Sequence, residues 1–213
     1  MKASAQEIFE ELFARYPALE ACRADVGAAF GILADAYRSG GKVLCCGNGG
    51  SASDCEHIVG ELLKKFKRHR AIPAGLKGRL AATGPDGALL AERLEGSLPA
   101  ISLVSQSGIL TAFANDVGWD EAFAQQLLGL ARPGDVLIAL STSGNSRNCV
   151  LAATLARELG VRTVALVGEG CGRLGGLCDV AIRVPARETY QVQEFHLPVY
   201  HALCAMLEEE LFD

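Results

Sequence analysis

The sequence from Lys42 to Phe66 passes from a short apolar segment through a glycine-rich turn into a helix-forming segment, and this order constrains the fold strongly. Residues 43–46 are apolar and have strand character. The Gly-Asn-Gly-Gly-Ser turn at residues 47–51 allows tight turning and lets backbone N–H groups approach an anion. We expect the helix to begin near Ser51 to Ser53, where small polar side chains can cap it. A strand, a glycine loop and a helix N-terminus in this order predict a phosphate-binding element in an α/β fold.

The glycine loop differs from the nucleotide-binding motifs. It matches neither G-x-G-x-x-G nor G-x-x-x-x-G-K-[ST], so we expect no nucleotide cofactor. One turn into the predicted helix, His57 and Glu61 are four residues apart and therefore share a helix face. An imidazole and a carboxylate close to an anion site favour acid–base chemistry on a phosphorylated substrate.

A second strand-like segment has the same continuation. Residues 135–140 are too uniformly apolar for a half-exposed strand and are typical of a parallel sheet. The sequence Ser-Thr-Ser-Gly-Asn-Ser follows at residues 141–146, and a helix is predicted from Arg147 to Leu159. Alone, this loop is consistent with an ordinary helix cap. Because ligands of open α/β sheets bind at the carboxyl ends of the strands, the two loops together predict a phosphate site.

The other elements complete an α/β pattern in one domain, residues 1–213, whose length is sufficient for a substantial core. Further strands are predicted at residues 99–104, 162–167 and 180–184, and further helices at residues 107–114, 122–130 and 189–211. In the last helix, positions 193 and 201 lie in one row, so Gln193 and His201 project toward a similar region.

Two segments stand apart from this pattern. Amphipathic helices within about residues 4–38 precede the first strand and pack either on their own domain or at a subunit interface. Residues 70–99, approximately, form a loop-rich insertion, which we expect to act as a lid or to cover a neighbouring subunit's site.

Local signals add two expectations. Ser4 and Glu7 have the spacing of a capping box, which places the start of the first helix at Ser4. The basic run at residues 64–70 is typical of a solvated helix end, because cations favour a helix C-terminus. The alternative is that one of these charges reaches a substrate phosphate in its own or a neighbouring subunit.

Charge and composition exclude several classes of protein. The net charge of −5 argues against a nucleic-acid-binding protein. No apolar run approaches the ~20 residues of a membrane span, and the N-terminal segment lacks the apolar core of a signal peptide, so we expect no membrane partner and a cytoplasmic location. The eight cysteines form no C-x-x-C pair and fall largely at apolar positions, so we expect buried thiols.

Four motifs now match a known family in order. They are C-G-N-G-G-S with H-x-x-x-E on the next helix, an N-D pair, I-A-L-S-T-S-G-N-S, and Q-E-x-H-x-x-x-x-H in the final helix. The chain resembles the sugar isomerase (SIS) domain family, and within it the phosphoheptose isomerases, over about residues 20–211. The resemblance implies a three-layer, flavodoxin-like α/β fold with a five-stranded parallel sheet. It also implies a homotetramer with active sites shared between subunits.

The resemblance also implies an activity and its residues. Phosphoheptose isomerases interconvert sedoheptulose 7-phosphate and D-glycero-D-manno-heptose 7-phosphate, and their general base and acid match Glu61 and His201. Members that bind zinc have ligands that match His57, Glu61, Gln193 and His201, although a carboxamide is an uncommon zinc ligand. Positions matching the family's substrate contacts are Asn48, Gly49, Gly50, Glu61, Asn115, Asp116, Ser141, Thr142, Ser143, Ser146 and Gln193.

The implied mechanism is an aldose–ketose isomerisation through an enediol, in which Glu61 transfers the carbon-bound proton and His201 the oxygen-bound one. Two alternatives are open. Some SIS relatives are not enzymes: they bind sugar phosphates as regulators or bind the bacterial replication initiator, and the latter lack this glutamate and histidine. The insertion at residues 70–99 also allows an isomerase of another sugar phosphate.

Overall fold

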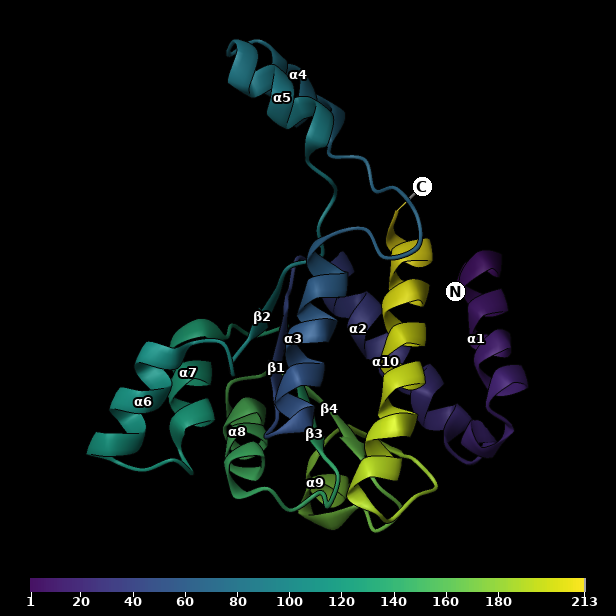
Figure 1. Ribbon diagram of the computed structural model, residues 1–213, viewed down its shortest axis with the longest axis vertical. Helices are drawn as coiled ribbons and strands as arrows, with labels where there is room; N and C mark the ends of the chain where they lie inside the picture. The colour runs from purple at the N-terminus through teal and green to yellow at the C-terminus, as the bar shows by residue number, and fades with distance from the viewer. Residues whose placement is uncertain (213) are drawn as a thin grey trace.

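Five parallel strands form the central sheet of the computed structural model, which describes residues 1–212 (Figure 1). In chain order they are β1 (Val43–Cys46), β2 (Ala100–Ser102), β3 (Val136–Ser141), β4 (Arg162–Val167) and β5 (Val180–Arg183). Their order across the sheet is β2-β1-β3-β4-β5, which is the flavodoxin-like order, and β1 pairs with β3 from Val43 opposite Val136. The prediction of a five-stranded parallel α/β sheet is confirmed.

Helices cover both faces of this sheet. In chain order they are α1 (Ala3–Arg15), the 3₁₀ helix η1 (Pro17–Cys22), α2 (Arg23–Arg38), α3 (Gly50–Leu63), α4 (Ala74–Ala81), α5 (Pro85–Arg93), α6 (Ser107–Asp116), α7 (Ala122–Leu130), α8 (Arg147–Glu158), α9 (Gly172–Leu177) and α10 (Thr189–Leu211). Helices α1, α2, α3 and α10 pack on one face, and α6 to α9 on the other. The N-terminal helices thus pack on their own domain, with α1 along α10.

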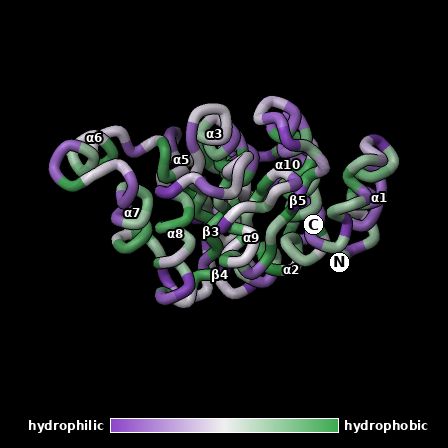
Figure 2. Tube along the Cα trace, turned by 90° about the horizontal axis from the view of Figure 1, so that it is seen from below, coloured by the Kyte–Doolittle hydropathy of each residue, from purple (hydrophilic) through white to green (hydrophobic). Residues whose placement is uncertain are grey.

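The strands are apolar throughout because both of their faces are buried. Val43 and Cys45 belong to the core beneath α2 and α10, whereas Leu44 and Cys46 belong to the core beneath α7 and α8. Figure 2 shows hydrophobic residues gathered along the central strands, with α1 and α6 on opposite sides of the molecule. Six of the eight cysteines are buried and all eight are free thiols, as the sequence predicts.

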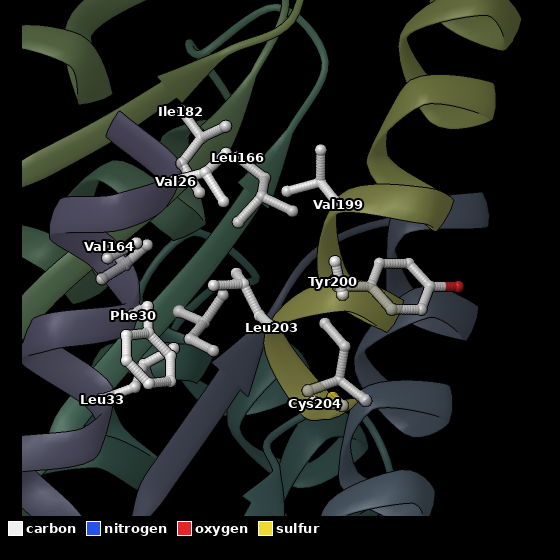
Figure 3. Packing of buried hydrophobic residues seen from close by; sticks show 14 of the residues in the cluster. Val26, Phe30, Leu33, Val164, Leu166, Ile182, Val199, Tyr200, Leu203 and Cys204 are labelled. Carbon is white, nitrogen blue, oxygen red and sulfur yellow. The ribbon is translucent and has the colours of Figure 1, made fainter. Parts of the chain in front are cut away.

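Apolar packing fixes the position of α10 against the sheet. In Figure 3 Phe30 and Leu33 of α2 face Leu166 of β4 and Leu203 of α10. Burial of each such side chain contributes about 1.5–3 kcal/mol. Helix α10 therefore has a fixed rotation, which directs its other side toward α3. Among the helices of residues 1–212, none combines the length and apolarity needed to cross a membrane.

The insertion forms a projecting helical hairpin, α4–α5. The two helices pack on each other, and no residue of α4 is buried. In Figure 1 the hairpin extends from the end of the molecule opposite the carboxyl ends of the strands. It is therefore not a lid over the loops of its own chain, and a role over a neighbouring subunit stays a prediction.

Three local predictions are wrong. Helix α1 begins at Ala3 with Lys2 as its N-cap and no side-chain cap, so Ser4 lies inside the helix. Helix α3 ends at Leu63 and the basic run continues as a loop, whose Arg70 is completely buried rather than solvated. Asn115 and Asp116, which lie beyond the helix predicted at residues 107–114, are the last residues of α6. In the basic run the local pattern fails because Arg70 pairs with the distant Glu208.

Candidate active site

The glycine loop connects β1 to the N-terminus of α3 and has little room for side chains. Gly49 is the N-cap of α3 with a positive φ of 56°, and the Ser51 backbone N–H donates to the Asn48 carbonyl. A Cβ on Gly50 would overlap the side-chain amide of Gln193. The loop therefore lies directly against the first turns of α10. This contact leaves no room for a side chain at position 50.

The serine loop connects β3 to α8 and is organised by its own hydroxyls. Ser141 and Ser146 are linked through their Oγ atoms at 2.8 Å, and the Asn145 N–H donates to Ser143 Oγ at 3.2 Å. Gly144 has a φ of 67°, and a Cβ there would collide with a neighbouring backbone carbonyl. Thr142 and Ser143 line an open hollow of about 270 Å³. These two hydroxyls can donate to an anion, as can the guanidinium of Arg187, which lines the same hollow and pairs there with Glu169.

A pair of amides joins the two loops. Asn48 of the glycine loop and Asn148 of α8 exchange two Nδ2–H···Oδ1 hydrogen bonds, each 2.9 Å long. Asn148 is buried, so this pair fixes the Asn48 side chain at the junction of the loops. Sequence reasoning missed Asn148. Its position, two residues beyond the serine loop on the following helix, is the signal that could have identified it.

Three of the candidate side chains meet where α3 crosses α10. His57 Nε2 lies 3.3 Å from Glu61 Oε1 and 3.4 Å from His201 Nε2. Glu61 is mostly buried, and its Oε2 forms an ion pair with Lys64 Nζ at 3.0 Å. Burial, followed by the neighbouring His57, lowers the pKa of His201, and Glu61 opposes this shift. The cluster thus brings a carboxylate and two imidazoles, which are the side chains that serve as general acids and bases, within reach of one another.

Two further side chains support this cluster and were missed by sequence reasoning. The buried Tyr200 donates a hydrogen bond to Asp54 Oδ1 at 3.1 Å and lies 3.0 Å from His57 Nδ1. Burial raises the pKa of Asp54, while the Tyr200 hydroxyl and His57 oppose the rise. Asp54 is three residues before His57, so the helix period alone could have placed both on one face.

Comparison with known proteins identifies the family. The SIS domain model matches residues 9–97 and 90–168. The chain belongs to the SIS domain family. A phosphoheptose isomerase of Rhodospirillum rubrum is 39% identical over 190 residues, which cover 89% of this chain and 88% of the relative. One of Geotalea daltonii is 41% identical over 187 residues, which cover 88% and 84%.

Solved structures agree. The phosphoheptose isomerase of Neisseria gonorrhoeae matches with a TM-score of 0.73 at 30% identity over 96% of both chains, and that of Francisella tularensis with 0.75 at 28%. This SIS domain is therefore an enzyme of the isomerase class that acts on a sugar phosphate. The enzyme interpretation of the sequence is confirmed, and the non-catalytic alternative is not supported.

The SIS domain partly fits the zinc ion that the resemblance implies. Within residues 1–212, no group of three or more His, Cys, Asp or Glu side chains already has the arrangement of a metal site. The atoms around His57 Nε2 come close, since two ligands of a tetrahedral zinc ion at about 2.1 Å lie about 3.4 Å apart. Glu61 Oε1 and His201 Nε2 are the two atoms at such distances from His57 Nε2, at 3.3 and 3.4 Å. Gln193, the fourth predicted ligand, lies against Gly50.

Two predicted substrate contacts lie away from the others. Asn115 and Asp116 are exposed at the end of α6 and bond to each other, Nδ2 to Oδ1, at 2.8 Å. In residues 1–212, neither makes a hydrogen bond or ion pair with any candidate residue outside this pair. Figure 1 shows α6 on the opposite side of the molecule from α10. In this SIS domain, a single chain does not bring the pair to the acid–base cluster.

Proposed function

We propose that this SIS domain interconverts sedoheptulose 7-phosphate and D-glycero-D-manno-heptose 7-phosphate. The observation that carries the proposal is the contact of Glu61, His57 and His201 between α3 and α10, in a chain about 40% identical to phosphoheptose isomerases. A carboxylate and an imidazole are the groups that proton transfer between adjacent carbons requires.

In the ketose-to-aldose direction, Glu61 removes a proton from C1 and His201 protonates the C2 carbonyl oxygen, which gives the enediol. Glu61 then returns its proton to C2, while the O1 hydroxyl proton leaves to His201 and the C1 carbonyl forms. Each residue finishes in its starting protonation state, so the isomerisation needs no oxidant or reductant. The lowered pKa of His201 makes its protonated form a stronger acid, so it gives up its proton to the C2 oxygen more readily.

We assign separate roles to the two loops. Ser141, Thr142, Ser143 and Ser146 hold the phosphate, because hydroxyls and a helix N-terminus converge there. Asn48, Gly49, Gly50 and Gln193 contact the sugar near its reacting carbons, since Gln193 packs on this loop from the helix that carries His201. Anchoring the phosphate at a distance fixes the reacting carbons beside Glu61.

Two finer features belong to the same proposal. His57, Glu61 and His201 would hold a zinc ion, with Gln193 as the fourth ligand, and such an ion stabilises negative charge on sugar oxygens. Asn115 and Asp116 would contact substrate bound by another subunit of a homotetramer. Metal analysis of the purified protein tests the first feature, and light scattering tests the second.

The cytoplasmic location stays a prediction from the N-terminal sequence, which cell fractionation tests.

Glu61→Gln is the decisive variant for the mechanism. The amide keeps the size of the side chain but cannot take a proton, so we expect turnover to fall on the order of 10²–10⁴-fold while sugar-phosphate binding persists. Glu56→Gln is the matched control, because Glu56 is an exposed carboxylate on the same helix whose contact is with Ser105. Near-normal turnover by Glu61→Gln would exclude Glu61 as the base.

A panel of five- to seven-carbon sugar phosphates tests the substrate. We expect sedoheptulose 7-phosphate to give the highest kcat/KM. A higher kcat/KM for a shorter sugar phosphate would show that the enzyme is an isomerase of that sugar. No turnover of any ketose phosphate would overturn the proposed function.

A further inference from the structure

An unbroken line of polar contacts runs from the α3–α10 interface to the acid–base cluster. It begins at Asp54, passes through the Tyr200 hydroxyl to His57 Nδ1, and continues from His57 Nε2 to Glu61 and His201. Figure 3 shows the Tyr200 ring leaving the apolar cluster of α10, with its oxygen directed away from the packed side chains. The hydroxyl is therefore placed for the polar contacts and not for packing.

The protons along this line can be assigned from chemistry. A carboxylate, the ordinary form of aspartate at neutral pH, only accepts hydrogen bonds, so Tyr200 donates its single proton to Asp54. A phenol has an ordinary pKa near 10, so it keeps that proton at neutral pH. The phenol oxygen then has only lone pairs for His57 Nδ1 at 3.0 Å, and Nδ1 must carry the imidazole proton. Neutral His57 is left with a lone pair on Nε2.

This assignment decides what His57 offers to its neighbours. Its Nε2 lone pair faces Glu61 Oε1 at 3.3 Å and His201 Nε2 at 3.4 Å. Acceptors this close require a proton or a cation between them. We propose that Tyr200 and Asp54 are positioning residues that hold His57 in its Nδ1–H form, so that Nε2 accepts a proton from, or shares a cation with, Glu61 and His201. The consequence for turnover rests on the proposed function, but the tautomer does not.

A purely structural role explains the arrangement less well. A phenylalanine at position 200 would fill the same apolar space without placing a hydroxyl beside Asp54. The half-buried Asp54 carboxylate is itself disfavoured by burial, as its raised pKa shows, and one of its oxygens lacks a hydrogen-bond partner in the described chain. The arrangement thus costs stability and orients an imidazole, as carboxylates do behind functional histidines.

Nitrogen-15 NMR of histidine-labelled protein tests the inference directly. The chain has four histidines, so His57→Gln assigns the His57 signals by their loss. In the wild-type protein near neutral pH we expect His57 to be the Nδ1–H tautomer. In Tyr200→Phe, which removes only the hydroxyl, we expect a shift toward the Nε2–H tautomer that free imidazole side chains favour. Tyr190→Phe is the matched control, because Tyr190 is an exposed tyrosine of the same helix.

Kinetics provide the second measurement. We expect kcat of Tyr200→Phe to fall about 10–100-fold with little change in KM, since the altered group acts on proton transfer and not on phosphate binding. An Nε2–H tautomer in the wild type, or an unchanged tautomer in Tyr200→Phe, would overturn the inference. A wild-type protein with Nδ1–H His57 but no isomerase activity would instead refute the proposed function alone.

Discussion

At Gly50, a single missing methyl group decides whether the glycine loop can lie against α10. A Cβ at this position would overlap the Gln193 amide, whereas a Cβ at Gly60, on the same helix, would meet nothing within 4 Å. The motif identified Gly50 as part of an anion loop. Its actual constraint is contact with a residue 143 positions later, which no local pattern reveals.

We therefore expect Gly50→Ala to raise KM for the sugar phosphate and to destabilise the fold by about 1–3 kcal/mol, because Gln193 must move. Gly60→Ala should instead stabilise the fold by about 0.5–1 kcal/mol, because alanine restricts the unfolded chain and favours the helix. Urea unfolding and steady-state kinetics of both variants measure this difference. Equal behaviour of the two variants would contradict the Gly50–Gln193 contact.

We expect the buried His196 to make the free energy of unfolding depend on pH. It is fully buried beside the Val167 backbone, and burial lowers its pKa to about 4. In the unfolded chain a histidine binds its proton near pH 6.5, so between about pH 6.5 and 4 the unfolded state holds more protons. The free energy of unfolding should then fall as the pH falls, by up to about 1.4 kcal/mol per unit, and level off below about pH 4.

Urea unfolding at several pH values in this window measures the slope. His196→Leu should make it shallower without abolishing it, since the pKa of His201 is also lowered and acts in the same direction. His69→Gln is the control, because it removes a histidine that is largely exposed. A slope that survives intact in His196→Leu would show that other groups cause it.

Among the elements, α3 and α10 are joined by a buried ion pair that the sequence did not predict. Arg70 Nε binds Glu208 Oε1 at 2.7 Å, and the other guanidinium nitrogens donate to the carbonyls of Leu62 and Glu61 at 2.7 and 2.9 Å. The Glu208 carboxylate also accepts three backbone N–H groups of residues 66–68. The pair thus caps the end of the helix that carries Glu61 and attaches it to the helix that carries His201.

We expect Glu208→Ala to destabilise the protein by about 3–5 kcal/mol, because it leaves the Arg70 charge buried without its partner. Although burial alone favours protonation, the backbone N–H groups of Phe66 and Lys67 and the Arg70 guanidinium hold the pKa of Glu208 below its usual range. Glu209→Ala, which removes the more exposed pair with Arg68, should cost less than about 1 kcal/mol. Similar losses in both variants, measured by chemical denaturation, would contradict the special role of the buried pair.

The elements themselves were largely predictable, and the contacts between them were not. Apolar segments and turn residues are local signals, so α7, α10 and β4 begin and end as expected. The two loops could be recognised because glycine and serine motifs are local too. The sequence predicted a solvated Arg70, because its partner Glu208 is 138 residues away and leaves no local signal. Tyr200 was missed, because its contact with Asp54 spans 146 residues and leaves no local signal in the sequence.

In the whole molecule, the α4–α5 hairpin is attached at its base but makes little core of its own. The Gly96 N–H donates to the Arg70 carbonyl at 2.8 Å and the Leu98 N–H to the Leu62 carbonyl at 2.9 Å, so the two ends of the insertion are held together. Its helices have eight and nine residues, too few for stability on their own. Leu76, Leu89, Leu90 and Leu94 are all exposed on it. These features favour a hairpin that packs on a second copy of the chain.

Replacement of residues 74–93 by a short Gly-Ser linker tests this interpretation. Because the ends already meet at Arg70 and Gly96 and α4 buries nothing, we expect the shortened chain to keep its fold and its apparent Tm within a few degrees. Light scattering should show a smaller oligomer than the wild type, and turnover should fall because contributions from a neighbouring subunit are lost. Leu89→Asp in the full chain should weaken assembly in the same way, whereas Glu92→Ala, exposed on the same helix, should not. An unchanged mass in both the shortened chain and Leu89→Asp would place the subunit contacts elsewhere, and a shortened chain that fails to fold would show that the hairpin stabilises its own domain.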